Sequence, residues 1–185
     1  MTYRNGNYVA FYVDEPCSKS NLGAHATRDF CYYNSLKMWK AKDPKFPFID
    51  SHEKTYDVRD GSDFESTLKP RLHERLKKSK NIILFLSKYT ANSEALREEI
   101  DYGINTCSLP VIVIYPDFTD SEEIASNKTF TKEVVTLWNK LPILRESMGK
   151  VPTLHILMKK DLIETALVDS GYMVQTRKIP GKYIL

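Results

Sequence analysis

Two adjacent glutamates, Glu98 and Glu99, stand in the stretch SEALREEIDYGI between two strongly apolar runs. On a helix, Leu96, Ile100 and Ile104 share one face with the spacing of a buried stripe. At roughly 100° per residue, Glu98 falls almost opposite the centre of this stripe, and Glu99 falls roughly 80° from it. The phase therefore predicts that Glu98 is a solvated surface charge. It places Glu99 at the border of the buried face, where partial desolvation raises a carboxyl pKa and suits the group to chemistry.

Three further polar residues lie in predicted loops that could contact a ligand. Asp14 follows the first apolar run and could contact a ribose or an amide, although acids at strand ends are common. Ser18 lies in the loop CSKSNLGAH, which could offer backbone donors to a phosphate but lacks the Walker pattern. Arg59 could pair with a pyrophosphate through its planar guanidinium, or it could form an ordinary surface ion pair.

Other catalytic arrangements have little support in the sequence. His52 stands beside Asp50 and Ser51, but adjacent strand residues alternate in direction, so these three cannot converge as a triad. The chain has no GxSxG elbow and no HExxH helix, and its histidines are scattered. We expect no metal site and no cofactor.

Short apolar runs alternate with longer amphipathic segments, which is typical of an α/β protein with a parallel sheet. The predicted strands are 8–13, 47–50, 81–87, 109–116 and 153–158, and the predicted helices are about 27–40, 64–76, 92–106, 131–140 and 159–170. This series predicts a flavodoxin-like, doubly wound, five-stranded parallel sheet with strand order 2-1-3-4-5. Ligands bind such sheets beyond the carboxyl ends of the strands, where the order reverses. The helix that carries Glu99 follows strand three directly, so we expect it beside this crevice.

Two segments allow more than one interpretation. Leucines recur every four residues over 64–76, but Pro70 interrupts them, so either one helix kinks there or a second helix begins with Pro70 in its first turn. The C-terminal stretch GYMVQTRKIPGKYIL could form a small hairpin or an edge strand. No repeat or linker marks a boundary, so we expect a single domain over 1–185, with a core of about 8–170 and an extension at 171–185.

The composition favours a soluble protein of the cytoplasm. Among the 185 residues, 42% are hydrophobic and 28% are charged, and the net charge is only +3. Because the two signs are interspersed, the chain has no strong field for nucleic acid, and we expect no nucleic-acid partner. Three cysteines without a CxxC pair favour reduced thiols. We find no apolar leader and no run of about 18 apolar residues, so we expect no membrane association.

Four landmarks in order carry a resemblance to a known family. The run YVAFYVDE opens the series, Arg59 begins an Arg-Asp-Gly triplet after the second strand, and LHERLKKSKNIILFLS joins a helix, a serine and a strand that ends at Ser87. Ser93 and Glu99 then reproduce the spacing of the pattern S-x-W-C-x-x-E, with Ala95 at the tryptophan position. Over about residues 8–120 the chain resembles the TIR-like domains of bacterial anti-phage systems of the Thoeris type.

The resemblance implies an enzyme that cleaves the N-glycosidic bond of NAD and produces a nucleotide signal, with Glu99 as its essential carboxylate. It adds Ser87 and Ser93 to the expected substrate contacts, makes NAD a substrate, and implies TIR–TIR self-association and a separate effector protein. The absent tryptophan and Pro-Gly residues favour the first alternative, a non-catalytic module that acts by TIR–TIR assembly. A third interpretation is a domain that senses NAD or a derivative without turnover. The resemblance does not fix whether the product is linear, cyclic or conjugated ADP-ribose.

Overall fold

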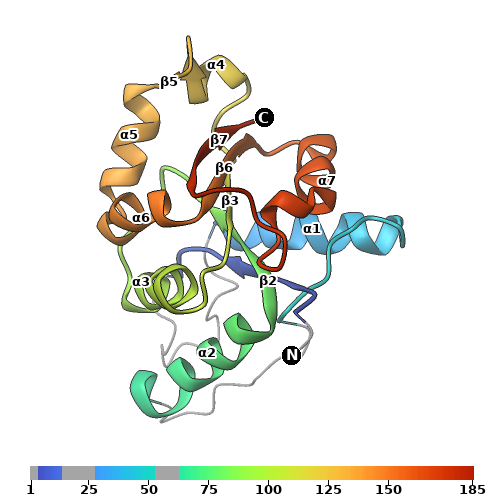
Figure 1. Cartoon of the computed structure of the whole chain (residues 1–185), viewed down its shortest axis with the longest axis vertical. Coiled ribbons are helices and arrows are strands. Elements are labelled where there is room, and N and C mark those ends of the chain that lie inside the picture. Colours follow the sequence, from blue (N-terminus) through green and yellow to red (C-terminus); the bar gives the residue numbers. More distant parts are fainter. Residues whose placement is uncertain (1–3, 14–27, 53–62) are drawn as a thin grey trace.

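The centre of the computed structural model is a five-stranded sheet in which all strands are parallel (Figure 1). The structure describes residues 4–13, 28–52 and 63–185. The strands follow the order β1-β2-β3-β6-β7. Their bounds are β1 Gly6–Ala10, β2 Ser79–Phe85, β3 Val111–Tyr115, β6 Pro152–Leu157 and β7 Gly181–Ile184. A parallel, doubly wound α/β fold is therefore confirmed.

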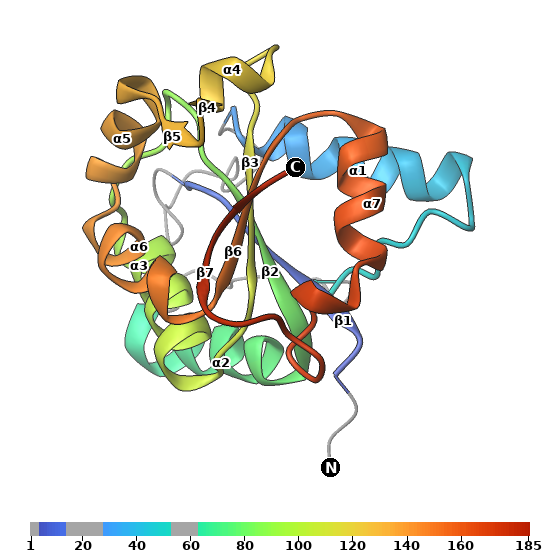
Figure 2. The same cartoon turned by 45° about the horizontal axis from the view of Figure 1, so that its top comes forward.

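Helices cover both faces of the sheet (Figure 2). The helices are α1 Phe30–Lys42, α2 Lys69–Lys78, α3 Glu94–Asp101, α4 Ser121–Ile124, α5 Lys132–Asn139, α6 Pro142–Ser147 and α7 Lys160–Val168. Helices α1 and α7 pack on one face, while α2, α3, α5 and α6 pack on the other, which gives two apolar cores. Because both faces are covered, β2, β3 and β6 are buried along their whole length, as their continuous apolar runs predict.

The predicted second strand, 47–50, is wrong as a full strand. Only Asp50 forms a parallel bridge, with Asn7 of β1. The next donor along β1 is the backbone N–H of Val9, which lies 3.3 Å from Nε2 of His52. The imidazole therefore occupies the place of a backbone acceptor, and within the described residues no second bridge pairs this segment with β1. The predicted neighbour order is otherwise kept, and β7 completes the five strands by pairing with β6.

At Pro70 the structure shows one continuous helical segment that changes from a π-helical turn to an α-helix. A π-helical turn, η2 (Phe64–Leu68), begins after Asp63, whose carboxylate accepts a hydrogen bond from the backbone N–H of Ser66. Helix α2 then begins with Pro70 in its first turn, where a missing N–H breaks no intrahelical bond. Likewise, a π-helical turn, η3 (Tyr102–Thr106), extends α3.

Elsewhere the structure departs from the sequence pattern in smaller ways. In α1, Met38 is 53% exposed, whereas Tyr33 and Leu36 are buried. The segment 117–130 forms α4 and a short hairpin of β4 (Ala125–Ser126) and β5 (Thr129–Phe130). Two 3-10 turns, η4 (Met148–Lys150) and η5 (Ser170–Tyr172), lead into β6 and out of α7. Within the described ranges, no helix combines the length and apolarity needed to cross a bilayer.

A buried chain of amides links the two ends of the described sequence. The side chain of Asn7 accepts a hydrogen bond from Ile49 N at 2.8 Å and donates one to Oδ1 of Asn81, also at 2.8 Å. Asn81 in turn donates to the carbonyl oxygen of Tyr172 at 2.9 Å. Because both asparagines are fully buried, each of these bonds is needed to satisfy a polar group away from water. This amide chain fixes the C-terminal segment against β1 and β2.

Candidate active site

Helix α3 turns Glu99 toward the sheet. The hydroxyl of Ser93 caps the helix by accepting a hydrogen bond from the backbone N–H of Leu96 at 3.3 Å. Leu96 and Ile100 are buried against the sheet, as the helical phase predicts. Glu99 is consequently directed at β1 and is partly buried. It contacts the middle of this strand rather than its carboxyl end.

The hydroxyl of Tyr8 donates a hydrogen bond to Oε1 of Glu99 at 2.8 Å. Tyr8 lies in β1 and is completely buried. Burial raises the pKa of Glu99 to about 8, although the hydrogen bond from Tyr8 and the positive charge of Arg75 act in the opposite direction. Burial and the neighbouring carboxylate raise the pKa of Tyr8 well above its ordinary value. Tyr8 therefore stays protonated and serves as the donor in this pair.

His52 and Arg75 complete the cluster around Tyr8. The imidazole of His52 lies with its ring centre 4.6 Å from that of Tyr8, and its Nδ1 lies 3.0 Å from Nη1 of Arg75. Burial, and then the nearby Arg75, lower the pKa of His52 to about 4, so its ring is neutral at neutral pH. Arg75 is thus the cation of this cluster, and its charge favours the ionised form of Glu99.

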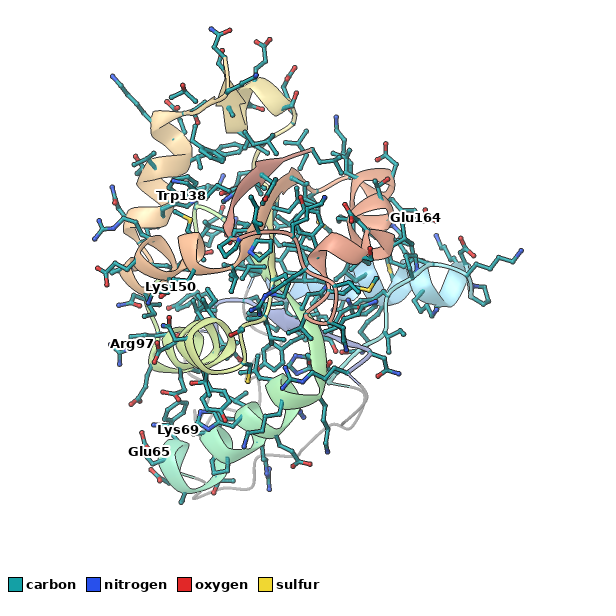
Figure 3. All side chains as sticks on the ribbon, in the orientation of Figure 1. Glu65, Lys69, Arg97, Trp138, Lys150 and Glu164 are labelled. Atoms are coloured by element: carbon teal, nitrogen blue, oxygen red, sulfur yellow. The ribbon has the colours of Figure 1, made fainter. Side chains whose placement is uncertain are left out.

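Glu98 is not the solvated charge that the helical phase predicts. Its side chain is 22% exposed, and its carboxylate lies 2.7 Å from Nε2 of His73 and 3.5 Å from Nζ of Lys69. The ring of His73 is stacked on Tyr102 with a centroid distance of 3.5 Å. Helix α2 runs beside α3 and covers this side of it, with Lys69 at the near end (Figure 3). Glu98 therefore joins two helices, while Arg97 points away from the sheet to solvent (Figure 3).

Ser87 lies in a different polar cluster. Its buried hydroxyl donates to Oδ1 of Asp29 at 2.7 Å and accepts from the backbone N–H of Tyr89 at 3.1 Å. Thr90 donates to the other oxygen of Asp29 at 3.2 Å. Burial raises the pKa of Asp29 above its ordinary value. These bonds give Ser87 a structural task, namely to fix the beginning of α1 against the chain that follows β2.

Three of the predicted contact residues, Asp14, Ser18 and Arg59, lie outside the described residues. Ser93 acts as a helix cap at the start of α3. Ala95, at the position where TIR patterns have tryptophan, is buried. Within the described part of the chain, no cluster of His, Cys, Asp and Glu side chains could hold a metal ion.

A comparison with protein families identifies the chain. The family model described as Thoeris protein ThsB, TIR-like domain, matches residues 8–121 of the 185. The chain belongs to this Thoeris TIR-like family. The match extends from β1 to the start of α4, so it contains Tyr8, His52, Arg75 and Glu99. Membership gives the chain a role in Thoeris defence signalling, a system with other components.

The sequence predicts the direction of the Glu99 side chain but does not connect Glu99 with Tyr8, His52 and Arg75. Tyr8, His52 and Arg75 come from three separate segments, and no spacing rule connects them. Tyr8 carries one usable signal, which is a polar hydroxyl within an otherwise apolar strand that must be buried on both faces. A buried tyrosine hydroxyl requires a hydrogen-bond partner, and the sequence does not reveal which one.

Proposed function

We propose that this Thoeris TIR-like protein cleaves the N-glycosidic bond between nicotinamide and ribose in NAD and so produces a nucleotide signal. The proposal is supported chiefly by Glu99, a partly buried carboxyl group at the position of the essential glutamate of the TIR pattern. Its hydrogen bond to Tyr8 and its raised pKa distinguish it from a surface carboxylate. Such perturbed groups concentrate at functional sites.

In the proposed reaction, the bond between the ribose C1′ and the nicotinamide nitrogen breaks, and its electron pair leaves with neutral nicotinamide. Positive charge then develops on the ribose ring, as in glycoside hydrolysis. The carboxylate of Glu99 stabilises this charge more in the transition state than in the ground state. Water, or a hydroxyl or amine of an acceptor, then bonds to C1′ and loses a proton. The acceptor decides whether the product is linear, cyclic or conjugated ADP-ribose.

The raised pKa of Glu99 is compatible with this role because the substrate carries charge. The nicotinamide ring of NAD is cationic, and an opposite charge close to a carboxyl group favours its ionised form. Substrate binding therefore converts a largely protonated Glu99 into the carboxylate that the reaction needs. Arg75 acts in the same direction from helix α2.

The direct test is to incubate concentrated protein with NAD and to measure nicotinamide by chromatography. We expect release by the wild type and a loss of roughly 100-fold or more in Glu99→Gln, because a single charge-stabilising group can contribute that much. Glu98→Gln is the matched control and should retain activity, since Glu98 bonds to His73 and Lys69 of α2. Nicotinamide release that survives Glu99→Gln would refute the assignment.

Replacement of the family tryptophan by Ala95 favours a second candidate, a non-catalytic module that assembles with other TIR-like chains or senses an NAD derivative. The same samples separate it from the enzyme. A sensor would bind NAD or ADP-ribose without turnover, as measured by calorimetry. An assembly module would form oligomers without either ligand, as measured by light scattering.

A further inference from the structure

Glu99 is held at one of its two oxygens. Tyr8 donates to Oε1, and no other side chain in the described ranges is seen to donate a hydrogen bond to this carboxyl group. Glu99 remains partly accessible, whereas Tyr8 is completely buried. The hydrogen bond therefore restrains Oε1 from the protein side, and Oε2 is the oxygen left for a ligand.

We propose that Tyr8 is the positioning residue of Glu99, fixing the carboxylate through Oε1 so that Oε2 meets the ribosyl group of the substrate. This inference rests on the proposed function and assigns to β1 a part in the same reaction. Tyr8 is well suited to the task because both its backbone and its ring are held in place. It pairs with Ile82 of β2 in register, and its ring packs against His52.

Each element packed against Glu99 contributes a polar or charged group to its surroundings. Strand β1 supplies the neutral hydroxyl of Tyr8, and α2 supplies the cation of Arg75. His52 lies beside both groups and is neutral, so it adds no charge. On α3 itself, the neighbouring charge of Glu98 is turned toward Lys69 and His73. Tyr8 is consequently the group whose removal changes the hydrogen bonding of Glu99 without changing any formal charge.

The test is a pH titration of the Glu99 carboxyl carbon by NMR, with Glu99→Gln used to assign its signal. Tyr8→Phe keeps the buried ring and removes the donor. We expect its Glu99 titration midpoint to lie about 1 pH unit above that of the wild type, because a hydrogen bond to a charged acceptor stabilises the anion by about that much. Tyr115→Phe is the matched control. It also removes a buried hydroxyl bonded to other side chains, but two strands away, and should leave the midpoint unchanged.

Incorporation of 3-fluorotyrosine in place of Tyr8 provides a second variant, which should shift the Glu99 titration midpoint in the opposite direction. Its ring is nearly isosteric and its hydroxyl is a stronger donor, so the Glu99 midpoint should fall. This variant tests the inference even if Tyr8→Phe fails to fold. Equal midpoints in the wild type and in either Tyr8 variant would overturn the proposal.

Kinetics supply the second readout. Tyr8→Phe should lower kcat for nicotinamide release roughly tenfold or more, with KM changed less than about twofold, because the substrate gains most from a fixed carboxylate in the transition state. A shifted midpoint with an unchanged kcat would overturn the positioning role. If the wild type releases no nicotinamide, the proposed function fails, and the titration alone still decides whether Tyr8 fixes the carboxylate.

Discussion

A carboxyl group that is charged in the unfolded chain and protonated in the folded one makes folding dependent on pH. Glu99 is such a group, since its pKa is about 8 in the fold and 4.5 as a reference value for the unfolded chain. Its contribution to stability is fully present below pH 4.5 and is lost as the pH rises through 8. The burial that suits Glu99 to chemistry therefore destabilises the protein at neutral and alkaline pH.

Glu99→Gln should stabilise the protein even though it should abolish activity. Glutamine imitates the protonated acid and still accepts the hydrogen bond from Tyr8. We expect a gain of about 2–4 kcal/mol in the free energy of unfolding at pH 8, which shrinks to nothing at pH 4.5. Urea denaturation across this range measures it. Glu98→Gln should show no such gain, because it only removes a partly exposed ion pair worth less than about 1 kcal/mol.

The rate of nicotinamide release should depend on the same ionisation. Since kcat/KM reports groups of the free enzyme, it should rise with pH along a limb centred near 8, the pKa of Glu99. The limb in kcat should lie at lower pH, because the bound cationic nicotinamide favours the carboxylate. Initial rates over a pH series provide both curves. A kcat/KM that is flat between pH 6 and pH 9 would contradict a role for an ionising Glu99.

At the scale of elements, Gly103 allows η3, the extension of α3, to pack closely on β2 and α2. A Cβ atom at Gly103 would lie 2.4 Å from Cδ1 of Ile82 and 3.3 Å from Cδ2 of Leu76, so alanine there would displace the buried side chain of Ile82. We expect Gly103→Ala to lower the free energy of unfolding by about 1–3 kcal/mol, the usual effect of overpacking. Because it displaces α3, it should also reduce nicotinamide release.

Gly149→Ala is the matched control for that substitution. A Cβ atom at Gly149 would meet no heavy atom within 4 Å, so the change should be neutral or slightly stabilising. Urea denaturation of both variants beside the wild type measures the difference. Equal stability of the two variants would contradict the close packing of η3 on β2.

The elements show which contacts a sequence predicts and which it does not. Strands β2, β3 and β6 were predictable because continuous apolar runs follow directly from burial on both faces. The direction of Glu99 was predictable because it depends only on neighbours within α3. The ion pair of Glu98 was not, since it depends on how α2 lies beside α3. The shortening of the predicted strand 47–50 to a single bridge at Asp50 was not predictable, because it depends on a side chain, His52, that replaces the backbone acceptor.

At the scale of the whole molecule, the buried histidines and Glu99 have opposite effects on the way the free energy of unfolding changes with pH. His52 and His155 have pKa values lowered by burial to about 4 and about 3, from 6.5. Below pH 6.5 the unfolded chain binds protons that the folded protein does not, so stability is lost as the pH falls. Glu99, and also buried Asp29 with its raised pKa, favour folding in acid and offset part of this loss.

The free energy of unfolding should therefore reach a maximum near pH 6.5 rather than near the isoelectric point of about 8.6. On the acid side the two histidines outweigh Glu99, and on the alkaline side the ionisation of Glu99 makes stability fall up to pH 8. Urea denaturation between pH 4 and pH 9 tests this. A free energy of unfolding that keeps rising to pH 8 would contradict the raised pKa of Glu99. Glu99→Gln should remove the decline in stability above pH 6.5.

The buried amide chain that joins Asn7, Asn81 and Tyr172 has a consequence for synthesis on the ribosome. Asn81 precedes its acceptor, the carbonyl oxygen of Tyr172, by 91 positions. A nascent chain that has emerged only through residue 121, the end of the family match, can form β1, β2 and β3 but leaves the donor of Asn81 without its native partner. The chain therefore completes its native sheet only after Tyr172 and β7 have emerged from the ribosome.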